Sequence, residues 1–251
     1  MKRTVVSYER SVFIPDLHVP YHDEKAFACA LNFVKAFQPD FIFIIGDWVD
    51  FYQLSKFDKN PARIHQLQDD IDASVKCLRR LRATAPKAKI YFIKGNHCHR
   101  LTRFLWSAAA ALASLRALTV PELLNFKELD IEYVEAGSMM FHGFLVKHGN
   151  VVRTRSGYSA TGELEKAGVS GISGHTHRLS HIFKRHYGGM YAWAEIGCLC
   201  QLSPEYMEGQ IPDWQHGLAF GYFKKGDNRF IVHVLPIIKG KLIFDGKEIA
   251  G

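Results

Sequence analysis

The sequence of 251 residues contains only five cysteines, an odd number that lacks the spacing of a disulfide framework. They are Cys29, Cys77, Cys98, Cys198 and Cys200. Such a set argues against a small secreted domain held together by disulfides and indicates a reducing compartment. The N-terminal residues also lack the apolar stretch of a signal peptide, so we expect a cytoplasmic protein.

Long apolar runs are absent as well. The nearest candidate, residues 108–120, is shorter than the roughly 20 apolar residues that a membrane helix requires, and it contains Arg116. We therefore expect no membrane-spanning segment and no membrane partner. Hydrophobic residues still make up 47% of the chain, which is enough for a substantial core. Because no linker, repeat or low-complexity segment divides the sequence, we expect residues 1–251 to form a single domain.

Acidic residues are in deficit, since 25 Asp and Glu stand against 32 Lys and Arg, and the net charge is +7. This balance is compatible with an anionic partner such as phosphate, a nucleotide or nucleic acid. Basic residues cluster at 79–82, 100–103, 153–155 and 178–185. The cluster at 79–82 is interpreted as a solvated helix face, whereas those at 100–103 and 153–155 follow motifs described below.

The first half of the chain alternates between short apolar runs and helical patterns. Residues 11–14, 41–45 and 90–93 are runs rich in β-branched and aromatic residues, which predicts buried strands. Apolar spacings of three and four residues predict helices at 23–37, 61–84 and 97–117, with a short helical turn at 121–126. Strands that alternate with helices in this way form a parallel sheet covered by helices.

The second half is predicted to consist of short strands, interrupted by one helix at 158–167. The predicted strands are 131–134, 139–141, 144–147, 171–173, 181–186, 190–194, 218–223, 230–235 and 241–244. These strands would build a second sheet. The predicted fold class is therefore α/β, with two sheets packed as an α/β sandwich.

Polar motifs follow several of these apolar runs. They are Asp16-Leu17-His18, Gly46-Asp47 with Asp50, Gly95-Asn96-His97, His148-Gly149 and Gly174-His175-Thr176-His177. In open α/β sheets, ligands bind at the edge outside the carboxyl ends of the strands. Each motif alone is a weak signal, but together they predict that Asp, Asn and His side chains meet at one rim of the sandwich.

Side chains of these types suit a pair of divalent cations. Mixed imidazole and oxygen donors favour Mn²⁺, Fe²⁺ or Zn²⁺ over Mg²⁺. Two such ions, about 3.5–4 Å apart, acidify a bridging water, neutralise phosphate oxygens and orient in-line attack on a phosphoester. The motifs therefore predict a dinuclear metal site that hydrolyses phosphoesters, and we expect Mn²⁺ to support activity in vitro.

The order of the motifs resembles the calcineurin-like metallophosphoesterase superfamily, whose pattern runs D-x-H, G-D-x-x-D, G-N-H-[E/D], H-G, G-H-x-H. The resemblance spans residues 16–177 and matches every ligand position in order. It implies that one metal is held by Asp16, His18 and His177. It implies that the other metal is held by Asn96, His148 and His175, with Asp47 as the bridge.

The resemblance also implies the residues that act on the substrate. His97 would donate a proton or hydrogen bond to the leaving oxygen, and Asp50 would orient its ring. Arg100, three residues further on, is expected to clamp a phosphate. The sequence departs from the family pattern at Cys98, where an acidic residue is usual, and this thiol would alter the local hydrogen bonds and could be oxidised.

Some residues near the motifs have two interpretations. Trp48, Phe51, Tyr52 and Phe57 either pack under a loop or form a platform for a nucleobase or a subunit. Trp106 and the alanine-rich residues after it are expected in the core. Cys198 and Cys200 are too closely spaced for a usual zinc pair and are interpreted as apolar strand residues.

The leading hypothesis is a phosphodiesterase that acts on a nucleotide or nucleic acid through a hydroxide bridging two metals. The basic balance and the aromatic residues after Asp47 favour this class of substrate. A phosphomonoesterase for small molecules is an alternative. Another is a catalytically inactive metal-binding scaffold, and a third is non-specific nucleic-acid binding without chemistry.

Overall fold

The computed structural model describes residues 7–60, 66–204, 207 and 209–251. Its larger sheet has six strands in the order β11-β10-β1-β2-β3-β4. These strands are β1 (Glu9–Ile14), β2 (Phe41–Ile44), β3 (Lys89–Ile93), β4 (Ile131–Val134), β10 (Gly217–Phe223) and β11 (Phe230–Pro236). Strands β1 to β4 are mutually parallel, whereas β10 runs antiparallel to β1 and β11 antiparallel to β10.

A second sheet has five strands in the order β5-β6-β7-β9-β8. The strands are β5 (Ser138–Phe141), β6 (Phe144–Lys147), β7 (Gly171–Ser173), β8 (Leu179–His186) and β9 (Gly189–Ile196). Within it, β6, β7 and β9 are parallel. The carboxyl ends of β6 and β7 therefore meet at one edge, as those of β1, β2 and β3 do in the larger sheet.

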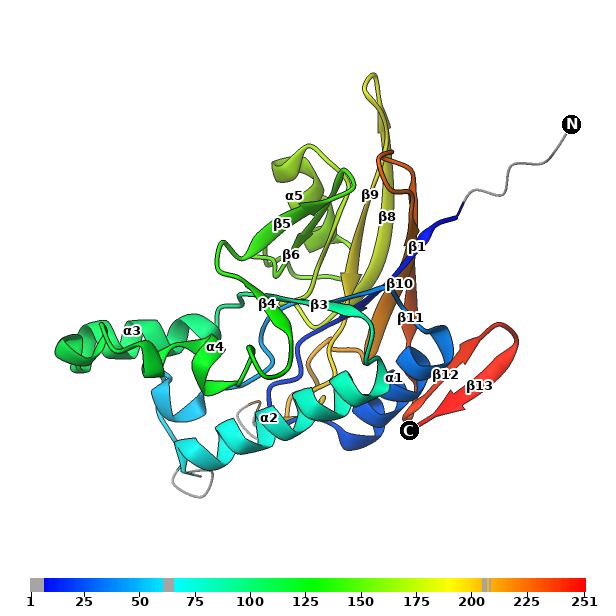
Figure 1. Cartoon of the computed structure of the whole chain (residues 1–251). Helices are drawn as coiled ribbons and strands as arrows, with labels where there is room; N and C mark the ends of the chain where they lie inside the picture. Colours follow the sequence, from blue (N-terminus) through cyan, green and yellow to red (C-terminus); the bar gives the residue numbers. More distant parts are fainter. Residues whose placement is uncertain (1–6, 61–65, 205–206, 208) are drawn as a thin grey trace, which may run out of the picture.

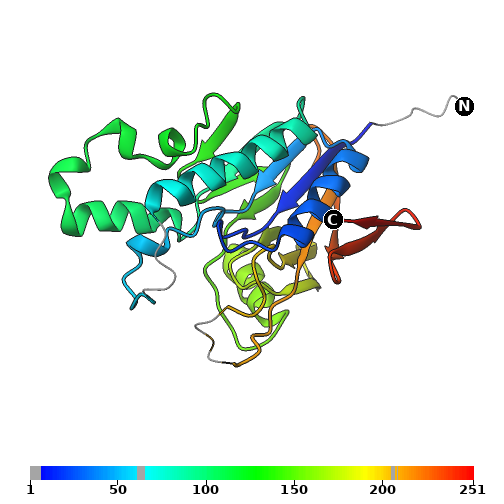
Figure 2. The ribbon, with the colours of Figure 1, turned by 90° about the horizontal axis from the view of Figure 1, so that it is seen from below.

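The two sheets pack face to face between helices (Figures 1 and 2). Strand β1 shows how alternation builds these layers, because Val12 and Ile14 join the core under the helices while Phe13 joins the core between the sheets. Helices α1 (Glu24–Phe37) and α2 (Leu67–Thr84) cover the larger sheet. Helix α5 (Tyr158–Ala167) packs on Trp193, on the outer face of the smaller sheet.

This architecture confirms the predicted α/β sandwich of two sheets, and the predicted strands appear with small shifts of their ends. A feature that the sequence did not predict is β13 (Lys247–Ala250), which pairs with β12 (Lys241–Phe244) as a separate hairpin. The hairpin lies beside α1 (Figure 1), and the Asn32 side chain of α1 donates to the carbonyl of Ala250 at 2.8 Å.

The predicted helix at 97–117 is wrong in its second half. Helix α3 (Cys98–Ala108) ends at Ala109, and the 3-10 turns η3 (Ala110–Leu112) and η4 (Arg116–Leu118) follow before α4 (Val120–Leu123). Residues 110–117 are exposed, so no apolar face packs on the rest of the protein. Alanine propensity alone sustains little helix without tertiary packing.

Helix α2 begins at Leu67, and the predicted start at Pro61 lies outside the described residues. Among the helices of the described residues, none has the length and apolar character needed to cross a bilayer.

Candidate metal centre

The polar motifs lie at the strand ends where the sequence predicted them. Asp16 and His18 follow β1, Asp47 and Asp50 follow β2, and Asn96 with His97 follows β3. From the smaller sheet, His148 follows β6, and His175 with His177 follows β7. All five loops lie at the same rim. Motif residues that are spread from position 16 to position 177 of the sequence therefore lie close together.

One cluster of donor atoms contains Asp16, His18 and His177, and all three side chains are buried. The carboxylate of Asp16 lies 3.1 Å from Nε2 of His177 and accepts from the amide of His175 at 2.9 Å. Nε2 of His18 faces Nε2 of His177 at 3.1 Å. The structure therefore brings together the three residues that the family resemblance assigns to one metal.

A second cluster contains Asp47, His148 and His175. Nε2 of His148 lies 3.1 Å from Oδ2 of Asp47 and 3.2 Å from Nδ1 of His175. The side-chain oxygen of Asn96 lies 2.8 Å from the same nitrogen of His148. Nδ1 of His148 bonds the carbonyl of Ile45 at 2.7 Å, which turns Nε2 toward the other donors.

The donor set of these two clusters fits divalent cations. Histidine nitrogens face one another in both clusters. In each cluster, one of these nitrogens also lies 3.1 Å from a carboxylate oxygen. Oδ1 of Asp16 is completely buried and has no hydrogen-bond partner among the described residues. A buried carboxylate oxygen costs free energy unless a cation or donor satisfies it. Carboxylate oxygens and neutral imidazoles arranged in this way are typical ligands of first-row divalent metals.

Four residues of the two clusters have left-handed backbones. The φ angles are 51° for His18, 42° for Asp47, 68° for His175 and 60° for His177. This conformation is uncommon for residues other than glycine, and a strained backbone costs about 1–3 kcal/mol per residue. The fold therefore holds these side chains in position against local preference, as expected where ligand placement matters.

The glycines of the motifs leave room for the carboxylates. A Cβ atom on Gly95 would collide with Oδ1 of Asp47, and one on Gly174 would collide with Oδ1 of Asp16. A Cβ on Gly46 would lie 2.6 Å from Nδ1 of His148. Glycine therefore stands beside the donors because the chain approaches them too closely for any side chain.

Nearby charges change the pKa values of the clustered groups. Burial alone would lower the pKa of His148, but Asp47 and Asp16 raise it to about 9. Burial also opposes the charged form of His177, whose pKa is nevertheless raised to about 10 by Cys200 and Asp16. Burial lowers the pKa of His18. The carboxyl of Asp47 is buried, yet the histidines around it keep its pKa well below the ordinary value.

His97 is held by two contacts beside the clusters. Its Nδ1 lies 2.9 Å from the carbonyl oxygen of Asp50, and Arg100 donates to its Nε2 at 2.9 Å. A nitrogen that accepts from arginine carries no proton, so Nδ1 carries it and donates to the carbonyl. His97 thus lies in the protein as the Nδ1–H tautomer.

Asp50 contacts His97, as expected, and its carboxylate also contacts His18. This carboxylate lies 3.1 Å from Nδ1 of His18 and accepts from Arg100 at 3.0 Å, whereas its distance to Nδ1 of His97 is 3.4 Å. Asp50 therefore orients His18 through its carboxylate and orients His97 mainly through its backbone carbonyl.

A pocket of about 500 Å³ opens onto the clusters. Its lining includes His97 and Arg100 together with Tyr21, Tyr52, Phe57 and Trp214. For the aromatic residues after Asp47, the sequence left two interpretations open, namely packing under a loop or a platform for a nucleobase or a subunit. Trp48 and Phe51 are completely buried and pack in the core, whereas Tyr52 and Phe57 face the pocket.

The loops of the smaller sheet depend on two buried glutamates that sequence reasoning missed. Glu195 of β9 accepts from the hydroxyls of Thr176 at 2.7 Å and Ser180 at 2.8 Å, and from the amide of Gly157 at 3.0 Å. Thr176 lies between His175 and His177, so Glu195 fixes the loop that carries both. An acidic residue in the apolar run of β9 was the available signal.

Glu163 of α5 supports the loop after β6 in the same way. Its Oε1 accepts from the amides of Asn150 at 2.7 Å and Val151 at 2.9 Å, and its Oε2 accepts from Lys147 at 2.8 Å. Burial alone would raise the pKa of Glu163, but these donors lower it. Glu163 thereby holds the chain on both sides of His148.

The cysteines near the site are buried thiols. Burial, followed by the charge of Asp47, raises the pKa of Cys98 to about 12. The oxidation considered for Cys98 needs an accessible thiolate, and the structure provides neither access nor charge at this position. Cys198 and Cys200 lie just beyond β9 and are also buried, with the sulfur of Cys200 3.9 Å from Nδ1 of His177.

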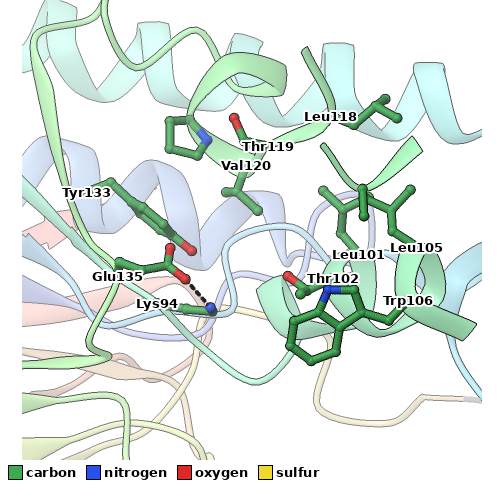
Figure 3. Close-up of a pocket in the computed structure, with 12 residues that line it drawn as sticks. Lys94, Leu101, Thr102, Leu105, Trp106, Leu118, Thr119, Val120, Tyr133 and Glu135 are labelled. Atoms are coloured by element: carbon green, nitrogen blue, oxygen red, sulfur yellow. Dashed lines mark hydrogen bonds and ion pairs between the residues drawn. The ribbon is translucent and has the colours of Figure 1, made fainter. Parts of the chain in front are cut away.

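Trp106 does not lie in the core as expected. Its side chain is 64% exposed at the edge of a separate cavity of about 190 Å³, which Figure 3 shows. Lys94 and Glu135 form an ion pair in the lining of this cavity. The expectation failed because the chain after α3 is exposed and offers no surface under which Trp106 could be buried.

The basic clusters also separate in the structure. Arg79 pairs with Glu128 at 3.0 Å, Arg80 pairs with Glu24, and Arg82 donates to the carbonyl of Leu129 at 2.8 Å. These contacts agree with a structural role for residues 79–82. Arg100 is the basic residue that reaches the pocket beside the clusters.

Comparison with known proteins gives matches along almost the whole chain. The Gene 54 protein of Mycobacterium phage D29 is 28% identical over 253 residues, covering 95% of this chain and 97% of that protein. The Gene 54 protein of Mycobacterium phage L5 is 27% identical over 256 residues, covering 95% of this chain and 98% of that protein.

Solved structures of similar shape include Vacuolar Protein Sorting 29 from Cryptosporidium parvum, with a TM-score of 0.47 and 14% identity over 98% of this chain and 96% of that chain. Wild-type Vps29 from Entamoeba histolytica complexed with Zn²⁺ gives a TM-score of 0.45 and 13% identity over 96% of this chain and 98% of that chain.

The family comparison covers the region that carries the motifs. Residues 10–179 match the family described as calcineurin-like phosphoesterase. This range contains both donor clusters and the loops on which they lie. The chain therefore belongs to the calcineurin-like phosphoesterase family.

Proposed function

We propose that the protein is a phosphodiesterase that uses two divalent cations and acts on a nucleotide or nucleic acid. The observation that carries the proposal is the meeting of two donor clusters with His97 and Arg100 beside one pocket. Family membership supports a metal-dependent phosphoesterase, and the pocket supports the narrower choice of substrate.

In this proposal, the first cation is held by Asp16, His18 and His177, and the second by Asn96, His148 and His175. Asp47 would contact both, because its carboxylate lies 3.1 Å from His148 and its backbone carbonyl accepts from the amide of His18 at 2.9 Å. When bound, the two cations would polarise the phosphate oxygens and acidify water. Mixed nitrogen and oxygen donors favour Mn²⁺, Fe²⁺ or Zn²⁺.

His97 would assist the leaving oxygen of the substrate. Once Arg100 leaves Nε2 of His97, that nitrogen would take up a proton from water and donate it to the leaving oxygen, while Nδ1 keeps its bond to the carbonyl of Asp50. Arg100 now bonds Nε2 at 2.9 Å, so it would leave that nitrogen and turn to a phosphate oxygen. The bond between Arg100 and His97 would thus break, and each residue would then contact the substrate.

The charges of the pocket favour a diester over a monoester. Among the described residues that line it, Arg100 supplies the one guanidinium and no lysine is present, while Asp47, Asp50 and Asp58 are acidic. A monoester near neutral pH carries close to two negative charges, whereas a diester carries one. Beyond the two proposed cations, Arg100 is the one Lys or Arg side chain in the described lining, which suits the single negative charge of a diester.

The proposal is tested by loading the protein with Mn²⁺ and comparing bis(p-nitrophenyl) phosphate with p-nitrophenyl phosphate. We expect a higher kcat/KM for the diester. Preference for the monoester would contradict the choice of a diester and support a phosphomonoesterase. Inactivity on both esters with Mn²⁺, Fe²⁺ and Zn²⁺ in turn would contradict an enzyme and support a metal-binding scaffold.

A further inference from the structure

We propose that the pocket beside the metal-site residues contains a subsite for an unpaired nucleobase, with Trp214 as its stacking surface. This inference rests on the proposed function and narrows the substrate to a nucleotide whose base is free of a duplex. Nothing in the sequence pattern marks Trp214, which lies 37 residues after the final motif residue, His177.

Trp214 is connected to His97 through successive contacts between aromatic rings. The ring centroids of His97 and His18 are 4.4 Å apart, those of His18 and His177 are 5.0 Å apart, and those of His177 and Trp214 are 4.4 Å apart. His18 and His177 are proposed to hold a cation, and His97 is expected to face the leaving oxygen. A tryptophan beside His177 is placed to contact the part of the substrate that adjoins the phosphate.

The surroundings of Trp214 suit a flat, partly polar group. Trp214 is half-buried, and Pro204, Cys200 and Gln201 line the same pocket. Aromatic and apolar atoms offer a stacking surface, and the side-chain amide of Gln201 has both a donor and an acceptor for the edge of a base. A nucleobase combines a π-face with such an edge, which a purely apolar group does not.

Further aromatic residues approach the pocket from the loop after β2. Tyr52 and Phe57 line it, and Phe57 is 69% exposed at its rim. The ring of Tyr52 meets that of Tyr21 edge to face, with centroids 6.0 Å apart. Proteins that bind single strands commonly present several aromatic side chains to successive bases. These residues give a neighbouring base a second contact area.

Stacking on Trp214 requires that a face of the base be accessible. Bases within a duplex have both faces covered by their neighbours, so a protein must unstack them before it can stack on them. A pocket of about 500 Å³ has the size of a small-ligand site rather than of a duplex groove. The subsite therefore favours free nucleotides and single strands over double-stranded nucleic acid.

The test compares two substrates with the same leaving group, thymidine 5′-(p-nitrophenyl phosphate) and ethyl p-nitrophenyl phosphate. We expect the wild type to prefer the thymidine ester, and Trp214→Ala to reduce the ratio of the two kcat/KM values about tenfold or more. Trp214→Phe should restore most of the ratio because phenylalanine also stacks. Trp106→Ala is the matched control, since Trp106 lines the separate cavity, and it should not change the ratio.

Other results would overturn the inference. Equal losses on both esters in Trp214→Ala would assign Trp214 a structural role, and equal preference for a hexyl ester and the thymidine ester would indicate an apolar site. A duplex cleaved faster than the same single strand would contradict the unpaired base.

Failure of the proposed function is recognised separately. If the wild type hydrolyses neither p-nitrophenyl ester, the proposed phosphodiesterase is wrong, and binding of thymidine 5′-monophosphate and deoxyribose 5-phosphate is then compared by calorimetry. Tighter binding of the base-containing ligand that disappears in Trp214→Ala would support the subsite without hydrolysis. Equal binding of both ligands would contradict it.

Discussion

The loops of the two sheets reach the same rim but are held there by different contacts. In the larger sheet, the amides of Leu17 and His18 donate to the carbonyl of Asp47 at 3.1 and 2.9 Å, and the amide of Asp50 donates to that of Val19 at 3.0 Å. These loops therefore support one another through the backbone, whatever side chains they carry.

In the smaller sheet, the amide of Gly174 donates to the carbonyl of His148 at 3.0 Å, and buried side chains hold the loops in addition. Glu195 bonds Thr176 beside both histidines of its loop, and Glu163 bonds the amides that follow His148. Both carboxylates are nearly or completely buried, so loss of either leaves buried donors without a partner. The comparison indicates that ligands from the smaller sheet are more sensitive to single substitutions away from the site.

The largest effect is expected at Asp47, where the two regions meet. Its Oδ1 accepts from the amide of His97 at 2.8 Å, and its Oδ2 lies 3.1 Å from His148. Asp47→Ala should abolish hydrolysis and weaken metal binding.

His97→Ala should lower kcat by about 10²–10⁴-fold and leave metal binding in place. Steady-state rates and metal titrations check both, and strong metal loss in His97→Ala would contradict these roles.

A smaller effect is expected when Glu195 is replaced. Glu195→Ala should weaken metal binding by about 10–100-fold, because the loop with His175 and His177 loses its anchor. Glu195→Gln should recover part of this loss, since one acceptor oxygen remains. Metal titration and thermal unfolding measure the two effects.

Glu24 provides a matched control for Glu195. Its carboxylate is exposed and pairs with Arg80 on the surface, so Glu24→Gln should change stability by less than about 1 kcal/mol and leave metal affinity unchanged. Similar behaviour of the glutamine variants at positions 24 and 195 would remove the distinction between the two regions.

A pH dependence of metal binding should distinguish histidines of the two regions. His148 and His177, both from the smaller sheet, have pKa values raised to about 9 and about 10, whereas burial lowers the pKa of His18. Without metal, the first two remain protonated below those values and must lose protons to bind a cation. Metal affinity should therefore rise with pH between about 6 and 9.

Calorimetric titrations with Mn²⁺ in buffers of different ionisation enthalpy measure the released protons directly. Replacing His18 should change proton release less than replacing His148. An affinity that does not vary across this pH range would show that the histidines of the smaller sheet bind metal without losing protons.

Much of the site could be predicted because its chemistry is local in sequence. Motifs such as Gly95-Asn96-His97 and Gly174-His175-Thr176-His177 place donors directly after apolar strands. The fold class followed for the same reason, since apolar runs and helical spacing are local patterns.

The missed features depend on packing between distant segments. Glu195 lies 19 residues from Thr176, and its burial beside that hydroxyl is not visible in the pattern of β9. The end of α3 at Ala109 was missed because alanine favours helix, whereas the structure offers that segment nothing to pack against. The additional contact of the Asp50 carboxylate with His18 is likewise a matter of side-chain geometry.

The sequence by itself determined the types of donor atom, their order along the chain and their places at strand ends, because these follow from residue identity and local periodicity. Only the tertiary structure decided which donors face one another, which buried carboxylates hold the loops, and that the ring of Trp214 contacts that of His177. These properties arise where two sheets meet, and contacts between segments far apart in the chain leave no periodic signal in it.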